Sequence, residues 1–233
     1  MHALDVGQMK RLMLSGVMSK SIFILLISVL AILFFSQQAM TFTWAELDDA
    51  GELPSTAQAT AGDEPLEFIT GFLESPTDVD MYAIYITGSE SFSATTVGWT
   101  TDVNTQLTLF DSTGMGVYSN DDDASTDGVQ STLPAFHPLT PTTPGIYYIA
   151  ISDYDWDPVS EGGYIFPSHY PFLHLRTDVE GPTDVGGGSP VTGWDGLSTM
   201  GGGSYAIALT GAVSSASVPK PPVMPWLPLL LGD

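Results

Sequence analysis

Short segments whose side chains alternate between two faces, as in a β-strand, are separated by Gly, Pro, Asp and Ser, and they constrain the fold of this chain most. The segment VDMYAIYI at residues 79–86 alternates in this way, and so does GIYYIAIS at residues 145–152. No stretch between residues 68 and 211 has the 3.6-residue apolar repeat of an amphipathic helix. Short strands at such close spacing predict an antiparallel sandwich or barrel. Similar segments occupy residues 91–97, 105–111, 115–119 and 203–211.

The first 40 residues differ from the rest of the chain. Three basic residues, Lys10, Arg11 and Lys20, precede an apolar run at residues 22–35 and a polar stretch of small residues. This order predicts a helical signal peptide or an uncleaved signal anchor over residues 1–40. The apolar run is shorter than the roughly 20 residues that a membrane span needs. We therefore expect the remainder to be secreted, extracellular or at the cell surface, with membrane contact only through this segment or the tail.

The charge of the chain is strongly negative, with 27 acidic residues against five basic ones. A surface of this kind repels phosphate backbones, so we expect no binding to nucleic acid. It favours cations, cationic partners or a salty medium. The chain has no cysteine, which excludes disulfide bonds, thiolate metal sites and a cysteine nucleophile.

Acidic side chains gather beside the ends of the predicted strands. Calcium is bound by six to eight oxygens, which carboxylates and backbone carbonyls in loops supply. Because loops from separate strands meet at one end of a sandwich, we expect residues 120–123 and residues 153–157 to share one ion. The alternative is that these side chains are solvated turn residues, since Asp caps local backbone N–H groups. The candidate ligands are Asp78, Asp80, Asp111, Asn120, Asp121, Asp122, Asp123, Asp153, Asp155 and Asp157.

Three tryptophans, Trp99, Trp156 and Trp194, fall in predicted loops beside Gly or Asp. Sugar-binding surfaces use such rings, because a ring face stacks on apolar C–H groups while nearby acids accept hydroxyl protons. The alternative is that the rings cover the ends of the sandwich.

Motifs for catalysis are missing. The chain has no G-x-S-x-G nucleophile motif, no H-E-x-x-H metal motif and no phosphate-binding loop. Acid pairs such as Asp153 and Asp155 are what a glycosidase uses, but a chain with this many acids forms such pairs by chance. We therefore predict that the protein is not an enzyme.

Several pieces, taken in order, carry a family resemblance. They are TWAELDDAGELPSTAQAT, ITGFLESPTDVDMYAIYI, TQLTLFDSTGMGVYSNDDDA, PGIYYIAIS and GSYAIALTGA. Together, over residues 43–212, they resemble the bacterial pre-peptidase C-terminal (PPC) domain, in the variant found as a lone exported protein. The resemblance implies a jelly-roll-like β-sandwich and a non-catalytic module of secreted or surface proteins. Some relatives bind calcium, so the resemblance also implies a calcium site.

Two stretches interrupt the pattern of strands. Residues 167–203 are rich in Gly and Pro and are predicted to form a surface excursion of the domain. Residues 213–233 form a Pro-rich linker with a short apolar end. Residues 218–221, VPKP, resemble the start of the "VPEP" type of C-terminal sorting signal, with Lys in place of Glu.

These features together predict an all-β, antiparallel, jelly-roll-like sandwich that follows an N-terminal signal helix. We expect a secreted, calcium-stabilised module that acts at the cell surface or in the extracellular matrix as a binding or assembly protein. Its partner would be an extracellular protein, a polysaccharide or a second copy of the chain. The alternative function is carbohydrate binding through the loop tryptophans.

Overall fold

The computed structural model describes residues 42–62, 65–167, 177–198 and 201–217, which belong to one unit of the chain, Thr41–Asp233. The predicted signal helix in residues 1–40 lies outside the described residues, and so does the sorting-signal resemblance at residues 218–221. Within the described part, no helix has the length and apolar character needed to cross a membrane.

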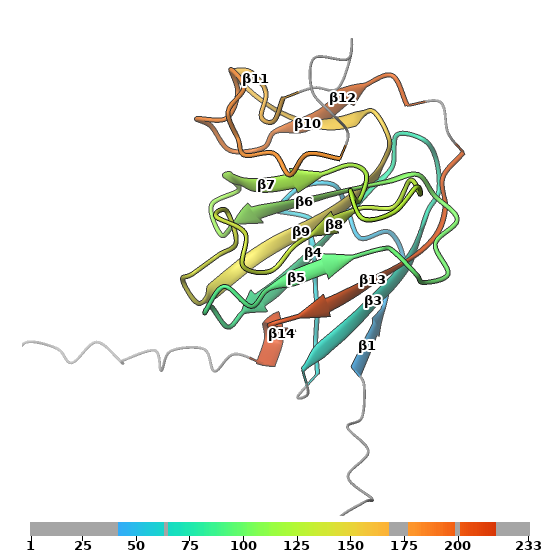
Figure 1. Cartoon of the computed structure of the whole chain (residues 1–233), viewed down its shortest axis with the longest axis vertical. Helices are drawn as coiled ribbons and strands as arrows, with labels where there is room; N and C mark the ends of the chain where they lie inside the picture. The colour runs from blue at the N-terminus through green and yellow to red at the C-terminus, as the bar shows by residue number, and fades with distance from the viewer. Residues whose placement is uncertain (1–41, 63–64, 168–176, 199–200, 218–233) are drawn as a thin grey trace, which may run out of the picture. The chain divides into compact units, whose positions relative to one another are not determined.

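The structure is all-β, as predicted, and its two largest sheets enclose the main hydrophobic core (Figure 1). One sheet has five strands in the order β1 (Phe42–Ala45), β3 (Leu66–Leu73), β13 (Gly203–Thr210), β5 (Ser93–Thr95) and β8 (Thr132–Leu133). The other has β14 (Ala212–Ser214), β4 (Val79–Ile86), β9 (Gly145–Asp153), β6 (Thr105–Asp111) and β7 (Gly116–Asn120), with β2 (Gln58–Ala59) also paired to β4. A short 3-10 helix, Ser215–Ser217, follows β14.

Local patterns predicted several strands well. Strands β4 and β6 begin and end at the predicted residues, whereas β5 is shorter than the segment 91–97. Most strand pairs are antiparallel, but β1 pairs with β3 and β2 pairs with β4 in parallel. The side chains of a strand alternate between two faces whether its neighbour is parallel or antiparallel. Alternation in the sequence therefore does not reveal the direction of the neighbouring strand.

A third sheet lies over the outer face of the six-stranded sheet (Figure 1). It contains β11 (Gly163–Tyr164), β10 (Trp156–Ser160) and β12 (Gly193–Gly196). Residues 177–198, predicted to form a surface excursion, are mostly exposed or half-buried, but they also supply β12 and the buried Val191. They help to form a second core with Val79, Met81, Phe110, Ala150, Ile165 and Phe166.

Strand β4 separates the two cores. Tyr82 and Ile84 belong to the main core between the large sheets, while Val79 and Met81 belong to the second core. Successive side chains of a strand point to opposite faces, so Asp80 lies on the same face as Tyr82. The core-facing position at this end of β4 thus carries a carboxyl group instead of an apolar side chain.

Candidate metal centre

The predicted acidic residues gather mainly at one end of the six-stranded sheet. Its register pairs Val79 at the start of β4 with Ser152 near the end of β9. It also pairs Thr105 at the start of β6 with Asp153. Strand β7 ends at Asn120, at this same end of β6. The loops that carry residues 78–80, 120–123 and 153–157 therefore leave the sheet at a common end.

Asp111 lies at the opposite end, where β6 turns into β7. Its Oδ1 accepts hydrogen bonds from the backbone N–H groups of Thr113 and Met115, at 2.8 and 3.1 Å, and from the Thr113 hydroxyl. This arrangement is a turn cap. Asp111 is thus separated from the other candidate ligands by the length of the strand.

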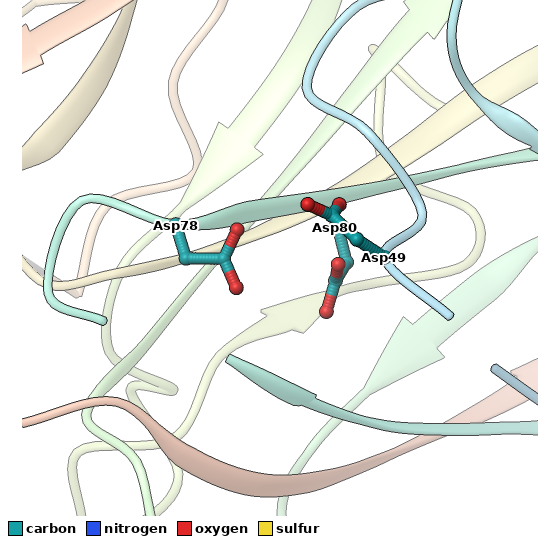
Figure 2. A group of neighbouring side chains, drawn as sticks. All are labelled: Asp49, Asp78 and Asp80. Atoms are coloured by element: carbon teal, nitrogen blue, oxygen red, sulfur yellow. The ribbon is translucent and has the colours of Figure 1, made fainter. Parts of the chain in front are cut away.

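Three carboxylates come together closely. Among the described residues, the one group of three or more acidic or His side chains with ligand atoms all within 4.8 Å is Asp49, Asp78 and Asp80. Figure 2 shows the carboxylate of Asp78 facing those of Asp80 and Asp49. Sequence patterns had indicated two of these residues but not Asp49, which lies in the loop after β1. A shared ion between residues 120–123 and 153–157 stays a prediction, since neither loop contributes to this group.

Backbone N–H groups hold two of the three carboxylates. Asp78 accepts from Val79 at 2.8 Å and from Glu74 at 2.7 Å, which fixes the turn before β4. Asp49 accepts from the N–H of Gly51 at 2.8 Å. The three residues are graded in burial, with Asp49 exposed, Asp78 half-buried and Asp80 fully buried. The group therefore reaches from the surface into the end of the core.

Asp80 is the unusual member of the group. Its side chain has no exposed surface, and its Oδ2 accepts a 2.6 Å hydrogen bond from the hydroxyl of Tyr205. Its Oδ1 is buried and accepts no hydrogen bond from an N–H or O–H donor, and the carboxyl group of Glu46 lies close enough to share a proton with Asp80. Buried polar atoms nearly always have a partner, so this carboxylate oxygen needs either a proton or a cation beside it.

The electrostatics of the group oppose its ionisation. Burial raises the pKa of Asp80 to about 9, the hydrogen bond from Tyr205 acts in the opposite direction, and the adjacent carboxyl group of Glu46 adds to the rise. The pKa of Glu74 is raised to about 7, first by a hydrogen bond with Asp78 and then by burial and the charge of Asp78. Burial and the charges of Asp78 and Asp49 also raise the pKa of Glu52.

No basic side chain in the described ranges offsets this charge. The chain has five Lys and Arg residues, and all of them lie outside the residues that the structure describes. Like charges this close destabilise one another unless a cation or a proton lies between them.

The ligand set fits a hard cation. Two oxygens that each lie about 2.4 Å from one Ca²⁺ are at most about 4.8 Å apart. The group offers only carboxylate oxygens, which suit calcium or magnesium, and no His or Cys, which transition metals favour. Calcium accepts irregular sets of six to eight oxygens, whereas magnesium needs near-ideal octahedral geometry. The three residues therefore lie close enough together to hold a hard divalent cation.

Other predicted ligands take part in holding their loops. The amide of Asn120 donates to the carbonyl groups of Asp122 and Asp178, at 3.0 and 3.2 Å, and its Oδ1 accepts from the N–H of Thr132 at 2.8 Å. Asp123 accepts from the N–H of Ser125 at 2.6 Å. Burial opposes the ionisation of Asp123, but hydrogen bonds from Ser125 and Thr132 outweigh it and lower its pKa. Asp121 is buried in this same loop.

The loop from β9 to β10 carries three further candidates. Burial raises the pKa of Asp153, although its Oδ1 accepts a 2.9 Å hydrogen bond from the N–H of Tyr154. Asp155 has a positive φ of 61°, which forms the turn. Asp157 lies within β10 and accepts a 3.0 Å hydrogen bond from the side chain of Gln106. Sequence patterns placed this strand in a loop, because Asp and Pro interrupt its alternation.

The three tryptophans have different surroundings. Trp156 and Trp194 pack against the second core, and the indole N–H of Trp194 donates to the carbonyl of Glu52 at 2.9 Å. Trp99 is 49% exposed and meets Phe68 edge to face, with ring centroids 4.6 Å apart. Of the three, Trp99 alone lines a groove of about 450 Å³ along β3 and β13, together with Phe68, Glu67 and Thr210 among others.

No protein-family model matches this chain, and no curated protein matches it. The PPC resemblance therefore stays a prediction from the sequence.

Proposed function

We propose that this protein is a non-enzymatic β-sandwich module that binds a calcium ion through Asp49, Asp78 and Asp80 and is stabilised by it. The observation that carries the proposal is the buried Oδ1 of Asp80, which accepts no hydrogen bond from an N–H or O–H donor and lies in a group of three carboxylates. No Lys or Arg among the described residues offsets the charge of this group, and a bound cation would do so.

The module acts at the cell surface or in the extracellular matrix, where it binds an extracellular protein or a polysaccharide, or assembles with its own copies. The basic and apolar order of residues 1–40 supports export. Extracellular calcium is abundant enough to occupy weak sites, since extracellular modules bind it with Kd values of about 10⁻⁴–10⁻³ M. The lack of nucleophile and metal-protease motifs supports a role without catalysis.

Calcium titration tests the proposal. Isothermal titration calorimetry of the exported part should show saturable calcium binding, and calcium at a hundred times Kd should stabilise the fold by about 2.7 kcal/mol. The Asp80→Asn variant should lose both effects, because the neutral amide cannot supply the charge that a cation needs. Asp111→Asn is the matched control, since Asp111 lies at the opposite end of β6.

Two outcomes would contradict the proposal. One is a melting temperature and a calorimetric trace that calcium leaves unchanged. The other is an equal loss of binding in Asp80→Asn and Asp111→Asn, which would point to diffuse attraction by the acidic surface and not to one site.

A second candidate function is carbohydrate binding at the groove beside Trp99. The half-exposed ring of Trp99 supports it, because Phe68 holds that ring edge-on beside Glu67 and Thr210. Such a platform suits the apolar face of a sugar, while the hydroxyl and carboxyl groups suit its polar edge. The cation site and the groove lie on different parts of the sandwich, so the two functions are compatible.

A further inference from the structure

Strand β13 brings a tyrosine from the opposite sheet to the candidate metal centre. The side chain of Tyr205 is 2% exposed, and its hydroxyl donates a 2.6 Å hydrogen bond to Oδ2 of Asp80. The hydrogen bond occupies one oxygen of the carboxylate, while the other, Oδ1, accepts from no N–H or O–H donor. Tyr205 thus contacts Asp80, the most buried carboxylate of the group, from the opposite sheet.

The direction of the hydrogen bonds in this network follows from proton counting. The hydroxyl oxygens of Tyr82 and Tyr205 are 2.5 Å apart, so one of them donates to the other. When Asp80 is ionised, as a metal ligand must be, its carboxylate only accepts, so the single hydroxyl proton of Tyr205 goes to Asp80. Tyr82 must therefore be the donor to Tyr205. The result is an ordered chain from Tyr82 through Tyr205 to the carboxylate, in which each hydrogen bond polarises the next.

The backbone makes room for this hydroxyl. Tyr205 pairs with Gly71 on the neighbouring strand β3. A Cβ at Gly71 would overlap the Tyr205 hydroxyl and would lie 2.5 Å from Oε2 of Glu46. Glu46 in turn accepts a 2.9 Å hydrogen bond from the N–H of Phe72. The space left by the missing side chain is thus shared by the tyrosine hydroxyl and by a fourth carboxyl group.

The hydrogen bond also favours the charged form of Asp80. A donor that stabilises a carboxylate in its charged form also stabilises the form that binds a cation.

We propose that Tyr205 is a positioning residue for the cation site: its hydroxyl orients the Asp80 carboxylate so that Oδ1 completes the ligand set with Asp49 and Asp78. This inference rests on the proposed function, because it concerns the same site. Removing a residue that hydrogen-bonds to a metal ligand, and so orients it, typically changes metal affinity by about 10- to 100-fold. The same range is expected here.

A pair of Tyr→Phe variants tests the inference. Tyr205→Phe removes the donor to Asp80, and its calcium Kd, measured by calorimetry, should rise about tenfold or more. Tyr82→Phe is the matched control, because it removes the other hydroxyl of the same buried pair and leaves the bond to Asp80 in place. Its Kd should stay within about threefold of that of the unmutated protein, since only polarisation of the next bond is lost.

Calcium-free melting separates positioning from general stability. Both variants lose one buried hydroxyl, so a purely structural role predicts similar losses of stability and similar calcium affinities in the two. An unchanged Kd in Tyr205→Phe, or equal weakening in both variants, would overturn the inference. If the unmutated protein binds no calcium, the proposed function fails first and this inference fails with it.

A spectroscopic measurement covers the case in which Tyr205→Phe does not fold. Calcium should change the near-ultraviolet tyrosine spectrum of the unmutated protein, because Tyr205 donates to a ligand of the ion. The change should persist in Tyr82→Phe. A protein that binds calcium without any such change would also overturn the inference.

Discussion

The side chains of Tyr205 and Asp80 share a 2.6 Å hydrogen bond although the two residues lie 125 positions apart, on facing sheets. At most positions between these sheets the side chains are apolar. Here the end of the core is polar, and it opens toward Asp78 and Asp49 at the surface. The hydrogen bond therefore joins the packing of the sandwich to the group of carboxylates that we propose as its cation site.

Stability without calcium should fall as the pH rises from about 4 to about 9. The pKa of Asp80 is raised by burial from its ordinary value of 3.8 to about 9 in the folded protein. Below pH 4 the carboxyl group is protonated in both states, so it adds no pH dependence there. Between the two values the unfolded state releases the proton while the folded state retains it, so each step up in pH favours unfolding. Glu74, with a pKa raised to about 7, acts in the same direction.

Urea unfolding in chelator at a series of pH values measures this dependence. Asp80→Asn should flatten the slope, because the amide does not titrate. Calcium should reduce the decline, since the cation stabilises the ionised group in the folded state. A stability that rises steadily with pH in chelator would show that Asp80 is ionised without a cation.

Gly71→Ala should destabilise the fold by about 1–3 kcal/mol and should also weaken calcium binding. The added methyl group would overlap the hydroxyl of Tyr205 and would push it from Asp80. Gly145→Ala is the control, because a Cβ there meets only the ring of Tyr147, at 3.8 Å. Urea unfolding and calcium titration of both variants give the answer. Equal effects in the two variants would mean that the cost is that of any glycine replacement in these strands.

Trp99→Ala should change the free energy of unfolding by about 1 kcal/mol or less, because the ring is 49% exposed. Trp194→Ala should cost at least about 2 kcal/mol, since that ring packs edge to face on Phe110 in the second core. Urea unfolding of the two variants measures the difference. A larger loss for Trp99 than for Trp194 would contradict the placement of these rings.

The same position tests carbohydrate binding. If the groove binds a sugar, tryptophan fluorescence should respond to some member of a polysaccharide panel, and Trp99→Ala should abolish the response. Trp194→Phe is a suitable control, because it keeps an aromatic ring in the second core. No response from the unmutated protein across a broad panel would remove this second function.

Asn120→Ala should lower stability by about 1–3 kcal/mol, equally in calcium and in chelator. Its amide joins the loop after β7 to Asp178 and to the start of β8 through three hydrogen bonds. Asn104→Ala should cost less, since the Oδ1 of Asn104 has no hydrogen-bond partner. Thermal melts of both variants, in calcium and in chelator, measure these losses of stability. A loss that appears only with calcium would instead make Asn120 a ligand, as the sequence predicts.

Several features of this protein are determined by the sequence alone. The strands β4 and β6 were predicted to the residue, because alternation and the turn residues that end a strand are local properties. The sequence also shows the excess of acidic over basic residues. From short segments it predicts that acidic loops leave a sheet at one end. Asp78 and Asp80 were recognised in this way, since they directly precede and begin a clear strand.

The tertiary structure decided which of these acids come together. Asp49 joins Asp78 and Asp80 only because the loop after β1 lies against the start of β4, and no local pattern encodes that contact. The third sheet, the parallel pairing of β1 with β3 and the parallel pairing of β2 with β4 are likewise products of long-range packing. In the sequence, Tyr205 looks like an ordinary core residue of a strand. Its role depends on the meeting of two sheets, which is set by the burial of whole faces and not by neighbouring residues.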